Sequence, residues 1–169
     1  MKHYAAYAIG AALVDTEIQV TDAELAAMNV EKGMMALVDQ ARQRYMLTTL
    51  SDHLIRANHA SGGSAGNSMI ATAMMGAPTY MSCKVAQDAD GDIYLADLEQ
   101  SGVVHGLTER STDGVTGKCI VLITPDAERS LNTHLGISET LSTDEVDEAA
   151  IKGSEWVYLE GYLVTSPTG

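Results

Sequence analysis

Residues 61–67 read Ser-Gly-Gly-Ser-Ala-Gly-Asn and lie between two segments of different character. Residues 53–60 before them are predicted as a strand, and residues 68–75 after them carry apolar side chains at helical spacing. Glycines at such a junction let a ligand approach the backbone, and the start of the helix leaves N–H donors free. A plain tight turn explains the same glycines equally well on spacing alone. The segment is neither a Walker loop nor a clean dinucleotide fingerprint.

Outward from this junction, strands and helices alternate along much of the chain. The patterns predict strands at residues 4–12, 15–20, 33–38, 79–85, 103–107, 117–124, 128–135 and 156–162, the last of them buried. Residues 15–20 alternate as in a half-exposed strand. Helices are predicted at 22–28, 39–50, 88–100 and 142–152, and a capping box at residues 21–24 starts the first of them. Alternation of the two element types favours an α/β fold with a parallel sheet. Strands that follow one another directly, around residues 10–20 and 103–135, predict a small second sheet.

Composition limits the classes of function that the chain can have. The 169 residues are 46% apolar, which is typical of one globular domain with its own core. Lys and Arg number 10 against 23 Asp and Glu, and the resulting charge of −13 repels nucleic acid and anionic membranes. We therefore expect neither as a partner, and any phosphate site must depend on local basic groups or helix N-termini. No apolar run reaches the roughly 20 residues that span a bilayer.

Cysteine, histidine and aromatic usage add three expectations. Cys83 and Cys119 are far apart in the sequence, which favours two buried thiols in a reducing, cytoplasmic setting over a disulfide. The five histidines are scattered, so we expect no metal site. Phenylalanine is absent, whereas Met occurs 9 times and Tyr 7 times, and these residues are expected to fill core positions in its place.

Six short segments, in order, resemble the N-terminal motifs of the PfkB (ribokinase-like) kinases, and most closely those of the adenosine-kinase-like branch. They are residues 10–15 (GAALVD), 62–67 (GGSAGN), 83–91 (CKVAQDADG), 116–119 (TGKC), 128–131 (ERSL) and 158–162 (YLEGY). The resemblance covers essentially the whole chain. It implies a three-layer ribokinase-like α/β fold, in which residues 1–169 form a single truncated domain, the N-terminal half of the fold. A small β-sheet lid is expected from strands at approximately 11–20, 33–38 and 103–135.

The same resemblance implies which residues contact a substrate. Asp15 would accept hydrogen bonds from the vicinal hydroxyls of a ribose, a charge-assisted arrangement, although it is also an ordinary turn residue. Gly62, Gly63 and Asn67 would hold the sugar. Cys119 would line the sugar pocket, with an ordinary buried cysteine as the alternative, and Arg129 would reach the transferred phosphate unless it is a solvated surface residue. The family often has Asn where this chain has Ala11.

The second motif of the family, Asp-Thr-x-Gly-Ala-Gly-Asp, does not occur in this sequence. In the family it carries the general base and the anion hole, so we expect no catalytic residue here and no activity from this chain alone. ATP and Mg²⁺ are the cofactors expected of the intact enzyme, and neither is expected to bind this chain tightly. Two alternatives stay open. One is a structural or engineered fragment that forms a homodimer through its lid strands or an exposed sheet edge, and the other, disfavoured, is an unrelated Rossmann-like enzyme.

Overall fold

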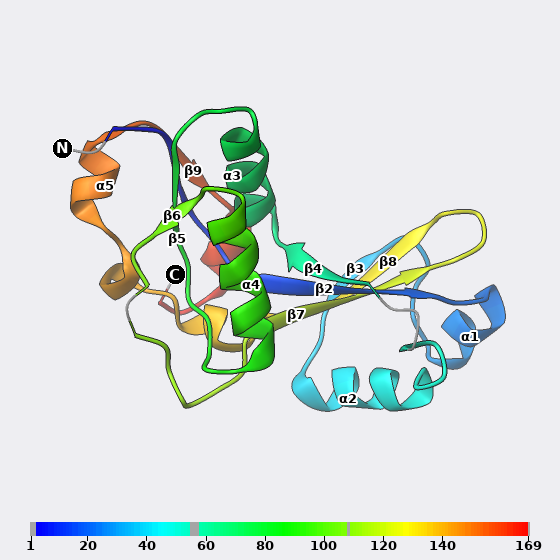
Figure 1. The fold of residues 1–169 in the computed structure, drawn as a ribbon. Coiled ribbons are helices and arrows are strands. Elements are labelled where there is room, and N and C mark those ends of the chain that lie inside the picture. Colours follow the sequence, from blue (N-terminus) through cyan, green and yellow to red (C-terminus); the bar gives the residue numbers. More distant parts are fainter. Residues whose placement is uncertain (1–2, 55–57, 108, 169) are drawn as a thin grey trace. The chain divides into compact units, whose positions relative to one another are not determined.

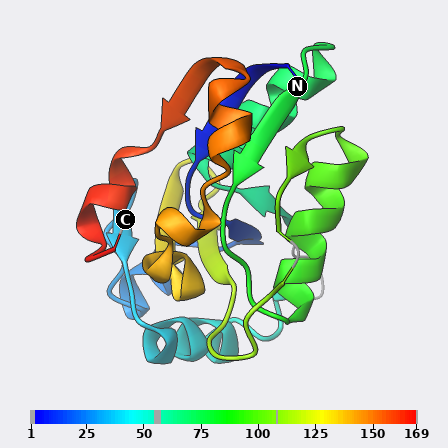
Figure 2. The same ribbon diagram turned by 90° about the vertical axis from the view of Figure 1, so that its left-hand side faces the viewer.

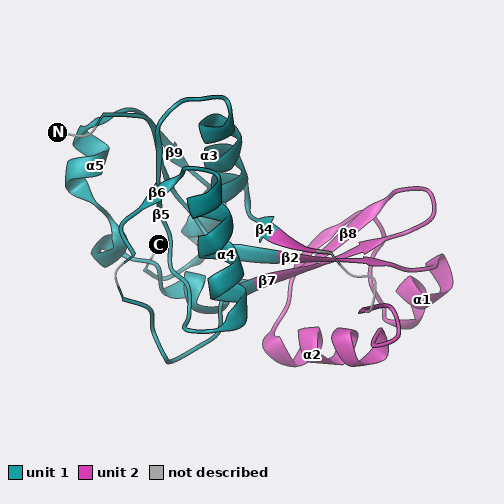
Figure 3. Cartoon of the chain, viewed as in Figure 1, with its two compact units in different colours: residues 1–14, 61–117, 135–169 teal, residues 15–60, 118–134 magenta. Residues whose placement is uncertain are grey.

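The computed structural model describes residues 3–54, 58–107 and 109–168. The chain divides into two compact units (Figure 3). Unit 1 consists of residues 1–14, 61–117 and 135–169, and unit 2 consists of residues 15–60 and 118–134. No helix in the described ranges is long and apolar enough to cross a lipid bilayer.

Unit 1 is built on a parallel sheet of four strands in the order β6-β5-β1-β9. Figure 1 labels three of them, β5, β6 and β9. The strands are β1 (Tyr4–Ile9), β5 (Thr79–Ser82), β6 (Val104–His105) and β9 (Ser154–Leu159), and the helices are α3 (Ser64–Met74), α4 (Ala89–Gln100) and α5 (Glu148–Lys152). Among its described residues, unit 1 also has short 3₁₀ helices at Gly136–Thr140, Thr143–Glu145 and Gly161–Thr165. The α/β prediction with a parallel sheet is confirmed.

Two apolar clusters cover the two faces of this sheet. On one face, Ala8 and Met81 of the strands pack with Met69 of α3 and with Tyr94 and Leu98 of α4. On the other, three tyrosines of β1 and β5 pack against Ala150 of α5, which is drawn in orange in Figure 2, namely Tyr4, Tyr7 and Tyr80. The rings of Tyr7 and Tyr80 stack with centroids 5.3 Å apart. Methionine and tyrosine therefore occupy core positions that phenylalanine often fills.

Unit 2 contains most of a second, mixed sheet in the order β3-β8-β7-β2-β4. Its strands are β2 (Leu13–Gln19), β3 (Met35–Leu37), β4 (Asn58–Gly62), β7 (Gly117–Ile123) and β8 (Arg129–His134), and its helices are α1 (Asp22–Ala27) and α2 (Gln40–Thr49). Ile18, Ile120 and Leu122 of the sheet pack with apolar side chains of both helices, so the helices cover one face. A capping box at Thr21 starts α1, as the sequence predicts, and Asp39 caps α2.

Several predicted elements are wrong in extent or environment. The strands expected at 4–12 and 79–85 end early, at Ile9 and Ser82. The strand expected at 103–107 is only β6, and it pairs with β5 in the parallel sheet of unit 1, outside the second sheet. The strand expected at 53–60 begins only at Asn58, because His53 and Leu54 still belong to the turns that follow α2, and residues 55–57 lie outside the described residues. The helix expected at 142–152 is interrupted, since Asp147 accepts a hydrogen bond from the N–H of Ala150 and so starts a separate helix, α5. The last strand, β9, is an exposed edge strand and is not buried, with Trp156 73% exposed.

Candidate functional site

The glycine segment forms a tight passage from β4 into α3. Gly63 is the N-cap of α3 with φ +84°, a conformation that favours glycine, and it contributes no side-chain hydrogen bond to the helix. A Cβ atom on Gly63 would lie 2.8 Å from the carbonyl oxygen of Ala11, and one on Gly66 would lie 2.5 Å from the hydroxyl of Tyr94. Close packing within unit 1 thus explains two of the glycines without a ligand.

Glu160, directly after β9, supplies the cap that Gly63 lacks. Its carboxylate accepts hydrogen bonds from the Ser64 hydroxyl at 2.6 Å, from the Ala65 N–H at 3.2 Å and from the Ala11 N–H. The side chain is buried, at 6% exposure for the residue. The sequence analysis assigned no role to Glu160. The sequence did contain a signal for it, because Glu160 is an acidic residue at the end of an apolar strand and lies in the motif of residues 158–162.

Asn67, the third predicted sugar-binding residue of unit 1, lies in the first turn of α3. Its backbone N–H donates to the Gly63 carbonyl at 3.1 Å, whereas its side chain is exposed. Gly62 is buried at the end of β4. Unit 1 therefore brings Gly62, Gly63 and Asn67 together at one strand-to-helix junction, with the amide of Asn67 accessible.

Unit 2 brings together Asp15, Cys119 and Arg129. Arg129 acts electrostatically on both Asp15 and Cys119, and Asp15 acts on Cys119 as well. Burial raises the pKa of the Asp15 carboxyl, Arg129 opposes this effect, and Glu17 adds to it. Burial raises the pKa of the Cys119 thiol to about 11, although the Thr133 hydroxyl donates a hydrogen bond to its sulfur at 3.3 Å.

Arg129 is engaged but accessible. Its guanidinium lies 2.9 Å from a carboxylate oxygen of Glu17, and its side chain is 52% exposed. Ion pairs of this exposed kind contribute little stability, so the guanidinium can change partner at small cost. Both interpretations of Arg129 given above, a phosphate contact and a surface ion pair, agree with this geometry.

Two of the quoted motifs, residues 83–91 and 116–119, meet in a hydrogen-bonded network in unit 1. Asp88 caps α4 by accepting from the Gly91 N–H at 2.8 Å, and it also accepts from the Thr116 N–H at 2.8 Å and the Thr116 hydroxyl at 2.6 Å. The Thr116 oxygen in turn accepts from the Ala86 N–H at 2.9 Å. Every one of these contacts joins protein groups, so the network stabilises the fold.

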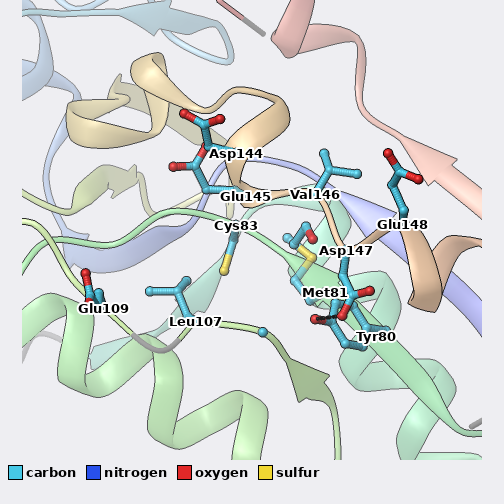
Figure 4. A pocket seen from close by; sticks show the side chains of 12 residues that line it. Tyr80, Met81, Cys83, Leu107, Glu109, Asp144, Glu145, Val146, Asp147 and Glu148 are labelled. Carbon is cyan, nitrogen blue, oxygen red and sulfur yellow. Dashed lines mark hydrogen bonds between the residues drawn. The ribbon is translucent and has the colours of Figure 1, made fainter.

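Two cavities lined by described residues contain none of the predicted site residues in their lining. In unit 1 a cavity of about 610 Å³ lies beside β5 and is surrounded by five acidic side chains (Figure 4), Glu109, Asp144, Glu145, Asp147 and Glu148. In unit 2 a cavity of about 960 Å³ is lined by residues 19–21, 24, 52–53, 123–125 and 127. The acidic lining of the first cavity disfavours phosphate. Within the described residues, no three His, Cys, Asp or Glu side chains are grouped so that they could hold a metal ion.

The cysteine prediction is confirmed, because Cys83 and Cys119 are both free and buried. Burial raises the pKa of Cys83 to about 12. A thiol with such a pKa is unreactive at neutral pH. Both cysteines are therefore structural in character, and only Cys119 lies close to other predicted site residues.

Comparisons with known proteins point to one family. The model of the pfkB family carbohydrate kinases matches residues 33–168. The chain is 32% identical to the adenosine kinase from Sinorhizobium meliloti and 31% identical to a probable sugar kinase from Rhizobium etli, each with a TM-score of 0.89. Each alignment covers 99% of this chain and 50% of the solved structure. A mouse ribokinase is 25% identical over 89 residues, 53% of this chain and 28% of that protein.

Proposed function

The chain belongs to the pfkB family of carbohydrate kinases, and we propose that it is the substrate-binding half of a kinase for a sugar or nucleoside. Its fold is ribokinase-like, and it spans about half the length of the solved kinases that it resembles. In the intact enzyme, the γ-phosphate of ATP would be transferred to a hydroxyl of the bound ribose or nucleoside.

Asp15 carries this proposal. It is half-buried, burial raises its pKa, and among the residues that the structure describes no group donates a hydrogen bond to its carboxylate. A half-buried carboxylate without a donor from the protein can accept hydrogen bonds from a ligand, and carboxylates with perturbed pKa values concentrate at functional sites. The two hydroxyls of a vicinal diol are donors that a single carboxylate can accept, and a ribose presents such a pair.

Each unit has its own set of proposed substrate contacts. In unit 1, the backbone of Gly62 and Gly63 and the exposed amide of Asn67 offer both donors and acceptors to sugar hydroxyls. In unit 2, Asp15 would accept from hydroxyls, Cys119 would form part of the apolar lining, and Arg129 would contact the transferred phosphate after leaving Glu17.

Catalysis by this chain alone is not expected. Phosphoryl transfer depends on positioning and on stabilisation of charge around the phosphate. Described residues of this chain provide no assembled set of metal ligands, and the basic side chain assigned to the phosphate is paired with Glu17. We therefore expect no tight binding of ATP or Mg²⁺ by this chain and assign no catalytic residue.

A self-associating module is the second candidate, and β9 favours it. This strand ends the sheet of unit 1, and large apolar side chains on both of its faces are exposed, namely Trp156, Val157, Tyr158 and Leu159. Parallel sheets are normally covered on both faces, and a free apolar edge pairs readily with another strand. We therefore also expect a homodimer at micromolar concentration, which sedimentation would detect as a mass that rises with concentration.

Ligand-observed NMR with matched nucleosides tests the proposal. Adenosine should bind, whereas 2′,3′-dideoxyadenosine, which lacks the diol, should bind at least about tenfold more weakly, as expected for the loss of hydrogen bonds to a charged acceptor. Incubation with ATP, Mg²⁺ and adenosine should produce no AMP. Equal binding of both nucleosides would contradict the role of Asp15, and robust AMP formation would contradict the proposed inactivity.

A further inference from the structure

His53 connects three segments of unit 2 through its imidazole ring. Nδ1 lies 2.8 Å from the carbonyl oxygen of Gln19 at the end of β2, and Nε2 lies 3.0 Å from the carboxylate of Glu24 in α1. The residue itself lies in the turns that follow α2, where its backbone N–H donates to the Leu50 carbonyl at 2.9 Å. One ring therefore joins the end of a strand, a helix and the segment after another helix.

Both partners of the ring are hydrogen-bond acceptors. A backbone carbonyl carries no proton, and Glu24 is ionised, since hydrogen bonds from the N–H and the hydroxyl of Thr21 lower the pKa of its carboxyl below 4.5. A neutral imidazole has one N–H group, whereas a positively charged imidazolium has two. Both contacts of His53 can therefore be hydrogen bonds only when its ring is protonated.

A second set of bonds holds the carboxylate of Glu24 in place. Its other oxygen accepts from the Thr21 N–H at 2.8 Å and from the Thr21 hydroxyl at 2.7 Å, which completes the capping box at the start of α1. Loss of a proton from His53 would set a lone pair of the ring against this carboxylate or against the Gln19 carbonyl. Because Glu24 cannot turn away without breaking the capping box, the ring and the segment that carries it would have to move.

The cavity of about 960 Å³ in unit 2 borders this ring. Among the described residues that line it, Asp52 is the one ionisable residue besides the histidine and the glutamate already described. Charged side chains elsewhere on the surrounding elements include several with other partners, namely Asp22 and Asp126 with Lys32, Glu17 with Arg129, and Arg42 with the Met28 carbonyl. The direct charged partner of the ring is therefore the carboxylate of α1.

We propose that His53 is a pH-sensitive link in unit 2, which when protonated holds the end of β2, α1 and the segment after α2 together, and when neutral releases one of its two partners. The side chains of His53 and Glu24 are 34% and 38% exposed, so the ring exchanges protons with the solution. The folded state favours the protonated ring, so the stability that the link contributes is present at acid pH. It is lost as the pH rises through the range of about 5 to 8, in which histidine ordinarily changes charge. None of the predicted site residues takes part, so the proposal does not depend on the proposed function.

Amide hydrogen exchange of the wild type at pH 5.5 and at pH 8 tests the link. The N–H groups of Met28 and Leu54, which donate to the carbonyls of Glu24 and Ser51, report on α1 and on the segment after α2. Their protection factors, which correct for the intrinsic effect of pH on exchange, should fall about three- to tenfold from pH 5.5 to pH 8, as expected for a partly exposed hydrogen bond to a charged group. Amides of β1 in unit 1 should change by less than about twofold. No loss at the two reporters, or an equal loss in β1, would overturn the proposal.

Glu24→Gln tests the proton count itself. Glutamine serves in a capping box as glutamate does, so its oxygen can still accept from Thr21. Its NH₂ group can donate to Nε2 of a neutral His53, whereas it would face an N–H of the protonated ring. The variant should therefore reverse the pH dependence, with protection at pH 8 at least as high as at pH 5.5. The same pH dependence as in the wild type would contradict the proposed link.

His105→Gln is the matched control. The ring of His105 in β6 of unit 1 contacts Glu99 through Nε2 at 3.3 Å, and its Nδ1 has no partner among the described residues, so a neutral ring can keep its contact. The variant should retain the wild-type pH dependence at Met28 and Leu54. Loss of that dependence in His105→Gln would assign it to a general effect of histidine charge and would overturn the role of His53.

Discussion

Replacement of Gly63 by alanine should destabilise unit 1 far more than an ordinary glycine substitution. Gly63 has φ +84° and ψ 142°, a region that residues other than glycine rarely enter, at a cost of about 1–3 kcal/mol. The added Cβ would also lie 2.8 Å from the Ala11 carbonyl oxygen, a backbone atom that cannot rotate away. Such overpacking costs about 1–3 kcal/mol. Together they predict a loss of roughly 3 kcal/mol in the free energy of unfolding.

Gly102→Ala is the matched control for this substitution. Gly102 has φ +80°, and no atom lies within 4 Å of the place that an added Cβ would occupy, so only the backbone cost applies, about 1 kcal/mol. Urea unfolding followed by circular dichroism measures both values with one protocol. If Gly63→Ala costs no more than Gly102→Ala, the close approach of residues 63 and 11 does not constrain the fold as described.

Three further predictions concern other residues of the two units. Asp15→Asn should raise the free energy of unfolding at pH 7 while weakening adenosine binding. Burial raises the pKa of Asp15 in the folded protein above 3.8, so the wild type loses stability as the pH rises through the folded pKa and the carboxyl ionises. Asparagine stays neutral and avoids this loss. Unfolding curves at several pH values check the sign, and a less stable variant at pH 7 would contradict it. Asp88→Ala should lower the free energy of unfolding by about 3 kcal/mol, since it removes the α4 cap and both hydrogen bonds from Thr116. Urea denaturation of Asp88→Ala and of Asp88→Asn would measure this loss of stability. Cys83 and Cys119, with pKa values raised to about 12 and about 11, should resist iodoacetamide at pH 8 until the protein unfolds, as mass spectrometry would show.

The sequence predicted those elements of the fold that depend on local patterns. Alternating apolar and polar residues identified β2, and the Thr21 capping box identified the start of α1, because both signals lie within a few neighbouring residues. The environment of β9 was predicted wrongly for a physical reason. The run Trp156–Leu159 is as apolar as a buried strand, and only the strand order shows that it lies at an edge.

Local patterns located the glycine junction of the candidate site but not its other residues. Glycines at 62 and 63 signalled a close backbone approach, and Gly63 indeed needs its positive φ. The resemblance, and not local physics, selected Asp15, Cys119 and Arg129, whose mutual electrostatic effects depend on strand pairing in unit 2. Glu160 lies inside the quoted motif of residues 158–162, but its role was missed because its partners are 95 or more residues distant.

Calorimetric titration of the purified chain with adenosine tests the central claim most directly. The variants are Asp15→Ala and, as a control for charge, Asp52→Ala, an exposed acidic residue of the same unit. We predict binding to the wild type and to Asp52→Ala, and a loss of about tenfold or more in Asp15→Ala, as expected when hydrogen bonds to a charged acceptor are removed. Folded wild-type protein that binds no adenosine or simple sugar, or Asp15→Ala that binds as tightly as the wild type, would contradict the claim that this chain is a substrate-binding half.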